Sequence, residues 1–136
     1  MGLFGKLKKQ NNPTLKEDII KAKDWIARAL NSSGYKADFT IESLKEIDRF
    51  FDEQVYGLLD EDTGTKLFSI GCYIGEVLIS KHGGCWIADD RDPQGEVNIA
   101  VKFHNGTMIW PARRAIKRYR SGEKYGIYEY AVFLDE

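Results

Sequence analysis

Glu76 is the residue whose type and position are best suited to chemistry. It is a carboxylate in the middle of an apolar stretch, residues 65–82. A carboxylate in such surroundings must be paired, hydrogen-bonded or kept protonated, and burial raises its pKa toward the range used by general acids and bases. We favour a structural partner for Glu76, and the alternatives are a catalytic or ligand-binding site and simple exposure on an open side of the helix. The partners considered are Arg113, Arg114 and Tyr73.

A basic cluster in residues 112–120 is the second candidate. Five cations fall within eight residues, namely Arg113, Arg114, Lys117, Arg118 and Arg120. Such a cluster can bind phosphates or a carboxylate-rich partner, although a solvated helix face is the commoner meaning of a charge run.

Two tryptophans could add an aromatic contact to this cluster, because tryptophans often dominate binding energy at interfaces. They are Trp110 and Trp86. We favour Trp110, since it closes the predicted hairpin directly before the basic segment.

An acidic segment, residues 90–95, resembles the first half of a calcium-binding loop. Its matching residues are Asp90, Asp92, Gln94 and Gly95. Val101, however, stands where the bidentate glutamate of such a loop should be. We therefore expect an acidic connection between strands and no cation site.

The cysteines and histidines do not form a known motif. Cys72, His82, Cys85 and His104 lack the paired short spacings of a zinc site. Cys85 and His104 could serve as nucleophile and base, but without a supporting motif we expect a buried, inert thiol. The sequence contains no Gly-rich phosphate loop, nucleophile elbow or histidine-glutamate zinc motif. We expect neither a metal nor a cofactor.

Three helices should position the first half of the chain. Residues 14–17 have the form of a capping box, so the first helix should begin there and end at 31–34. A second helix should follow Thr40 and run to about Gln54. The third, residues 65–82, is apolar around nearly its whole circumference, which predicts a central, buried helix.

Within this third helix Gly71 and Gly75 lie one turn apart. Glycines at this spacing allow another element to approach the helix backbone closely. We expect such a packing contact.

The second half should contain short strands followed by helices. The predicted strands are residues 85–88, 97–103 and 107–110, and Asn105-Gly106 between the last two is a strong hairpin signal. Pro111 fits the first turn of a helix over 112–120 that Gly122 should close. Residues 125–134 could form a helix or a strand, and we favour a helix.

Composition indicates one ordinary globular domain. The chain has 136 residues, of which 43% are apolar and 30% charged, with a formal net charge of -1. This balance disfavours a dedicated nucleic-acid binder. The absence of a cysteine framework, and of a run of about 20 apolar residues, predicts a cytoplasmic protein without a transmembrane segment.

These elements predict the α+β fold class, as a helix-rich single domain. A central buried helix should pack against a small antiparallel β-sheet of about three strands. We expect residues 1–12 to form a flexible basic tail and residues 13–136 to form the domain.

Three blocks of sequence carry a resemblance. They are ESLKEIDRFFDE at 42–53, FSIGCYIGEVLISKHGGCW at 68–86, and WP…KRYRSGE between 110 and 123. On these blocks the chain resembles a family of small bacterial α+β proteins of unknown function. The resemblance implies a helix-rich domain with a small antiparallel sheet and a bacterial source, and it implies no activity. By analogy of size and class alone, an immunity-like role that blocks a toxin is one form its function could take.

The sequence favours a non-catalytic protein-binding or accessory module whose partner is another protein. The alternative is a small enzyme or ligand-binding domain that uses Glu76 on a small molecule. A third hypothesis is weak nucleic-acid binding through residues 112–120.

Overall fold

A computed structural model describes residues 13–54 and 62–134 of the chain. The elements follow in the order α2 (Leu15–Ser32), α3 (Leu44–Glu53), α4 (Thr63–His82), β1 (Gly84–Ile87), β2 (Ala100–Phe103), β3 (Met108–Ile109), α5 (Pro111–Ser121), the 3-10 turn η1 (Gly122–Tyr125) and α6 (Ile127–Leu134). The three strands form one antiparallel sheet in the order β1-β2-β3. The predicted helix-rich α+β class is confirmed. The tail predicted for residues 1–12 lies outside the described residues.

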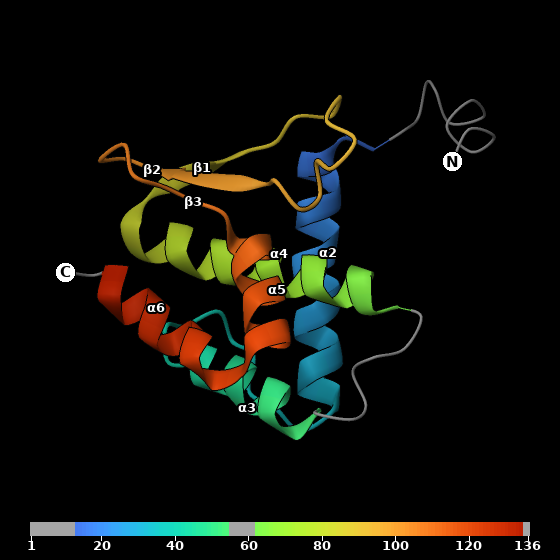
Figure 1. Cartoon of the computed structure of the whole chain (residues 1–136), viewed down its shortest axis with the longest axis vertical. Coiled ribbons are helices and arrows are strands. Elements are labelled where there is room, and N and C mark those ends of the chain that lie inside the picture. The colour runs from blue at the N-terminus through green and yellow to red at the C-terminus, as the bar shows by residue number, and fades with distance from the viewer. Residues whose placement is uncertain (1–12, 55–61, 135–136) are drawn as a thin grey trace.

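Helix α4 is the centre of the fold, as its apolar sequence predicts. Figure 1 shows the sheet on one side of α4 and helices α3 and α6 on the other, with α5 in front of α4 and α2 behind it. Both α2 and α5 pack against α4. Several α4 side chains are completely buried, among them Ile70, Tyr73, Ile74 and Leu78. Burial of these apolar groups on several sides of one helix supplies much of the driving force for folding.

The two glycines of α4 make the close contacts that their spacing predicts. A Cβ atom at Gly71 would lie 2.6 Å from the Cα of Ala112, and one at Gly75 would overlap the ring of Trp86. Gly71 therefore admits the first turn of α5, and Gly75 admits the tryptophan of β1. Neither approach leaves room for a larger residue.

Helix α2 begins as its capping box predicts. The backbone N–H of Glu17 donates to the Thr14 hydroxyl, and the Glu17 carboxylate accepts from the Thr14 N–H at 2.7 Å. Two orphan donors at the helix start are thereby satisfied. A residue distant in sequence adds a further acceptor, because Asp90 accepts from the N–H of Leu15 at 2.7 Å.

The sheet is shorter than predicted. β2 begins at Ala100 and not at Val97, because residues 94–98 form turns in which the N–H groups of Val97 and Asn98 donate to the carbonyl of Gln94. The hairpin at Asn105-Gly106 is confirmed, with Gly106 at a φ of +92°. The N–H of Phe103 donates to the carbonyl of Thr107 at 2.8 Å across this turn.

Helix α3 also begins later than predicted, at Leu44. Residues 40–43 form a tight turn in which the N–H of Ser43 donates to the carbonyl of Thr40 at 3.0 Å. The turn follows Phe39, the only non-glycine residue of positive φ in the described chain, at +64°. A phenylalanine in this left-handed region is strained, so neighbouring contacts must hold it there.

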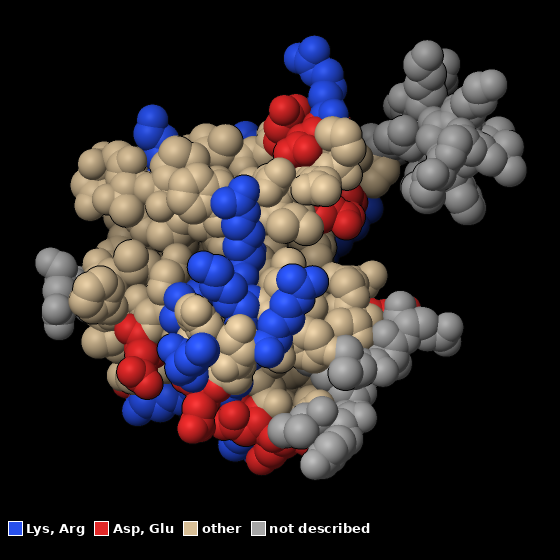
Figure 2. Space-filling model, in the orientation of Figure 1, with Lys and Arg blue, Asp and Glu red and all other residues tan. Residues whose placement is uncertain are grey.

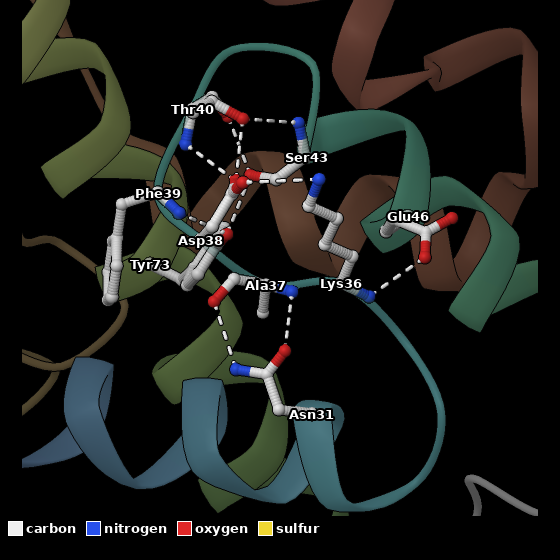
Figure 3. A network of polar contacts seen from close by, with 9 residues as sticks. All are labelled: Asn31, Lys36, Ala37, Asp38, Phe39, Thr40, Ser43, Glu46 and Tyr73. Atoms are coloured by element: carbon white, nitrogen blue, oxygen red, sulfur yellow. Dashed lines mark hydrogen bonds and ion pairs between the residues drawn. The ribbon is translucent and has the colours of Figure 1, made fainter.

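A polar network around Tyr73 supplies those contacts (Figure 3). The Tyr73 hydroxyl accepts from the N–H of Phe39 at 2.9 Å and lies 2.6 Å from the hydroxyl of Ser43. The rings of Phe39 and Tyr73 stack with centroids 4.6 Å apart. At the far side of the loop, the amide of Asn31 exchanges two hydrogen bonds with the backbone of Ala37. The connection between α2 and α3 is thereby attached to the central helix.

Candidate functional site

The sequence of helix α5 sets its bounds, and its buried alanines set which side packs against α4. Pro111 occupies the first helical turn and Gly122, at a φ of +82°, ends the helix, as predicted. Ala112 and Ala115 are buried toward α4. The side of the helix that these alanines leave free faces outward.

Three cations lie on this outward side: Arg113, Lys117 and Arg120. They follow one another at steps of four and three residues, and all three are exposed. Figure 2 shows Lys and Arg side chains gathered over α5, with Asp and Glu near the upper and lower margins of this face. Within the described chain, none of the three has a carboxylate oxygen within the 4.0 Å of an ion pair. We call these three residues the α5 stripe.

Trp110 lies beside the start of the stripe. Trp110 is 38% exposed, and the guanidinium of Arg113 lies 5.3 Å from its ring centroid. Arg113 also donates to the amide oxygen of Asn98 at 2.7 Å, and Asn98 donates to Asp92 at 2.8 Å. The first cation of the stripe, Arg113, is therefore oriented by Asn98 and lies over the exposed ring of Trp110.

Arg118 of the predicted cluster lies inside the protein, with 4% of its surface exposed. Its guanidinium donates to Asp48 at 2.9 Å and to Asp52 at 2.7 Å. Burial lowers the pKa of Arg118, but the hydrogen bonds to Asp52 and Asp48 outweigh burial and raise it. Arg118 thus connects α5 to α3 and presents no charge to a partner.

Arg114 is also drawn toward the fold. Its guanidinium lies 4.4 Å from the ring centroid of Tyr130 and 5.3 Å from that of Tyr125. Burial lowers the pKa of Arg114, against weaker opposite effects of the neighbouring tyrosines and Asp48. The predicted cluster of five cations therefore divides into an exposed stripe and two residues that pack.

Glu76 has a structural partner, but not one of those predicted. Its carboxylate accepts a hydrogen bond from the indole N–H of Trp86 at 3.2 Å. Trp86 is partly buried over Gly75. The contact fixes the ring of Trp86 against α4, so this tryptophan belongs to the packing of β1 and not to the exposed aromatic surface.

The other polar candidates serve the local fold. Asp92 accepts from the N–H of Gln94 at 2.8 Å and from Asn98, and these hydrogen bonds lower its pKa. Cys72 is buried, which raises its pKa. The expectation of a buried thiol is wrong for Cys85, which is exposed because it points away from the core on β1. Among the described residues no group of three histidine, cysteine or acidic side chains could hold a metal ion.

An open surface pocket of about 370 Å³ lies between α2 and α4, away from α5. Trp25 and Phe68 form its apolar walls, and Asp18, Lys21 and Glu96 add charged groups. Glu76 is not among its lining residues. A small molecule could therefore occupy an open pocket of this size, but the pocket lacks Glu76, the carboxylate on which the small-molecule alternative was based.

The predicted basic cluster did not include two residues that lie next to the α5 stripe. Lys124 and Tyr125 follow Gly122 in the short turn η1, and their side chains lie near each other and near Lys117. The signal in the sequence was the continuation of lysine and tyrosine beyond the helix end.

No helix in the described parts of the chain is long and apolar enough to cross a membrane. In comparisons with known proteins, no family model, no curated protein and no solved structure matches this chain.

Proposed function

We propose that this domain is a non-catalytic protein-binding module whose α5 stripe and Trp110 bind an acidic surface on another protein. One observation carries the proposal. The three cations of the α5 stripe are exposed on one face of the helix, and none of them forms an ion pair within the described chain. In α3, by contrast, Lys45 pairs with Glu42 at 2.9 Å and Arg49 with Glu46 at 3.1 Å. The three cations of the α5 stripe are therefore available to pair with carboxylates of a partner.

A protein fits this surface better than a nucleic acid. The whole chain has a net charge of -1, and acidic side chains border the stripe on both sides in Figure 2. A long polyanion would meet repulsion at both borders, whereas a compact acidic patch would not. Trp110 adds apolar area that a protein interface can bury.

Trp110 and the cations of the α5 stripe should contribute differently to binding, depending on whether they lie at the centre or the edge of the interface. Cations at the edge of an interface raise the association rate and fix orientation, and each contributes about 0.2 to 1 kcal/mol. A buried tryptophan at the centre contributes about 2 kcal/mol or more. Trp110 should therefore supply much of the affinity, and the α5 stripe should select an acidic partner.

The test compares two charge-reversed variants of the full chain. One carries Arg113→Glu, Lys117→Glu and Arg120→Glu, and the matched control carries Lys16→Glu, Lys21→Glu and Arg28→Glu on α2. Both sets of residues are exposed, and both variants change the net charge equally. Each protein is used to capture binding partners from a lysate of the source organism, and captured proteins are then titrated against the purified variants.

We expect to capture an acidic protein that binds the wild type and the α2 variant. The α5 variant should no longer bind this protein. Affinity should fall as salt is raised. Equal binding to both variants would exclude the stripe as the interface. Binding of a DNA duplex at low salt, removed only by the α5 variant, would reassign the surface to nucleic acid.

A further inference from the structure

Three cations converge on the ring of Tyr125. The Arg114 guanidinium lies 5.3 Å from the ring centroid, the Lys124 ammonium 5.6 Å and the Lys117 ammonium 5.8 Å. Because all three distances end on one ring, the three charges lie within roughly one Debye length of one another, about 10 Å at 0.1 M salt. The electron-rich face of the ring attracts each cation, but the ring carries no net charge to balance them. We call these four residues the Tyr125 cluster.

No carboxylate of the described chain forms an ion pair with a cation of this cluster. None of its cations has a carboxylate oxygen within ion-pair distance. Glu123 and Glu129 lie close in sequence, and both are exposed without an ion pair to a described residue. Asp48 of α3 acts electrostatically on Arg114, but its carboxylate already accepts hydrogen bonds from Arg118 and from the start of α6.

Arg114 is the least satisfied member. Its Nε is buried and has no hydrogen-bond partner, and its Nη2 reaches only the carbonyl of Gly126 at 3.4 Å. Burying a guanidinium without an anion is costly, and an external anion beside the remaining nitrogen would recover part of that cost. Burial also lowers the pKa of Arg114, as expected of a cation without a carboxylate. Tyr125 is partly buried, and its hydroxyl makes no hydrogen bond to a described residue.

We propose that the Tyr125 cluster binds a phosphoryl group, with Arg114, Lys117 and Lys124 neutralising its charge and Tyr125 donating its hydroxyl. Three positive charges exceed what one carboxylate can balance, whereas a phosphomonoester carries a charge of about -1.5 to -2 at pH 7 and three strong acceptor oxygens. Arginine and lysine are both common ligands of phosphate groups, arginine through its planar fork of donors and lysine as a compact charge. The inference rests on the proposed function in one respect, that the phosphoryl group belongs to the acidic protein partner.

The test titrates the isolated, full-length protein with defined anions. The probes are inorganic phosphate, a short peptide containing one phosphoserine, and acetate, all at pH 7.5 and constant ionic strength. Binding is followed by backbone amide chemical shifts. The expected result is saturable shifts concentrated on residues 114–126 with phosphate and with the phosphopeptide, at concentrations at least about tenfold below those needed for acetate. If the phosphopeptide binds as tightly as phosphate, the source is a protein; if phosphate alone binds, the site is for the free anion.

Matched lysine variants localise the site. Lys117→Gln and Lys124→Gln should each weaken phosphate binding by about two- to fivefold, the range of one solvent-accessible ion pair. Lys102→Gln, which removes an exposed lysine from the sheet, changes the net charge equally and should leave binding unchanged. Shifts spread over all basic residues, equal affinity for acetate, or equal weakening by Lys102→Gln would overturn the proposal.

The two proposals fail separately. Phosphate binding is measured without any partner, and Lys124 is untouched by the α5 charge reversal. If phosphate does not bind, the proposed function still stands with a partner that presents carboxylates. If no partner is captured, the phosphate titration still tests the Tyr125 cluster.

Discussion

The guanidinium of Arg118 and the carboxylate of Asp48 meet at 2.9 Å inside the protein, although 70 residues separate them in sequence. The same carboxylate accepts from the N–H groups of Ile127 and Tyr128, the first two residues of α6. One ion pair thus connects α5 to α3 and caps the C-terminal helix, where an anion also interacts favourably with the helix dipole.

Replacing Arg118 should therefore destabilise the fold. Arg118→Met should lower the free energy of unfolding by about 2 kcal/mol. This is less than the about 3 to 5 kcal/mol for a fully buried pair, because the side chains of Asp48 and Asp52 are 21% and 57% exposed. Urea denaturation measures the change. Arg120→Met on the exposed side of the same helix should stay within about 0.5 kcal/mol of wild type, and an equal loss in both variants would contradict a structural role for Arg118.

Removing the hydroxyl of Tyr73 should release the strained loop before α3. Tyr73→Phe leaves the N–H of Phe39 without its acceptor, so the free energy of unfolding should fall by about 1 to 3 kcal/mol. Amide hydrogen exchange at Phe39 should accelerate. Tyr128→Phe is the control, because that hydroxyl only reaches Glu42 at the surface, at 3.4 Å. Unchanged exchange at Phe39 would show that other contacts hold its positive φ.

Two glycine-to-alanine changes in α4 should act in opposite directions. Gly75→Ala places a methyl group into the ring of Trp86, and the overpacking should cost about 1 to 3 kcal/mol and shift tryptophan fluorescence. Gly64→Ala adds a methyl group in open space and should stabilise the helix by up to about 1 kcal/mol. Thermal unfolding of both variants checks the signs. A neutral Gly75→Ala would mean that Trp86 can move away without cost.

Acidification should remove stability supplied by Glu46. Hydrogen bonds from Arg49 and from the N–H of Lys36 lower the pKa of Glu46 in the folded protein. A carboxylate with a lowered folded pKa contributes stability above its unfolded pKa, about 4.3, and loses it as pH falls through the folded value. The urea midpoint of the wild type should therefore fall more steeply between pH 6 and pH 3 than that of Glu46→Gln.

Arg49 provides the control for this pH dependence. Arg49→Gln removes the main cause of the lowered pKa and should also reduce the steepness. The double variant should add little to either single change, since both act on one interaction. Additive effects would show that the two residues influence acid stability independently.

The sequence by itself determined the local structure. The capping box before Leu15, the Asn105-Gly106 hairpin, and Pro111 and Gly122 around α5 all act through backbone hydrogen bonds and φ angles within a few residues. The buried character of α4 was equally readable, because apolar residues on every side of a helix require neighbours on every side. The predicted starts of α3 and β2 are wrong because the backbone there is held by other contacts. A turn and the Tyr73 hydroxyl hold the chain before α3, and turns at residues 94–98 precede β2.

Only the tertiary structure decided which charges remain available to a partner. Five cations in residues 112–120 look alike in sequence, yet Arg118 meets Asp48 and Asp52, whereas Lys117, its neighbour, faces outward. The carboxylate of Glu76 likewise accepts a hydrogen bond from the indole N–H of Trp86 and does not pair with an arginine of the described chain. Pairing of charges depends on which face of each helix packs and on which distant segment arrives there, and helix periodicity does not contain that information.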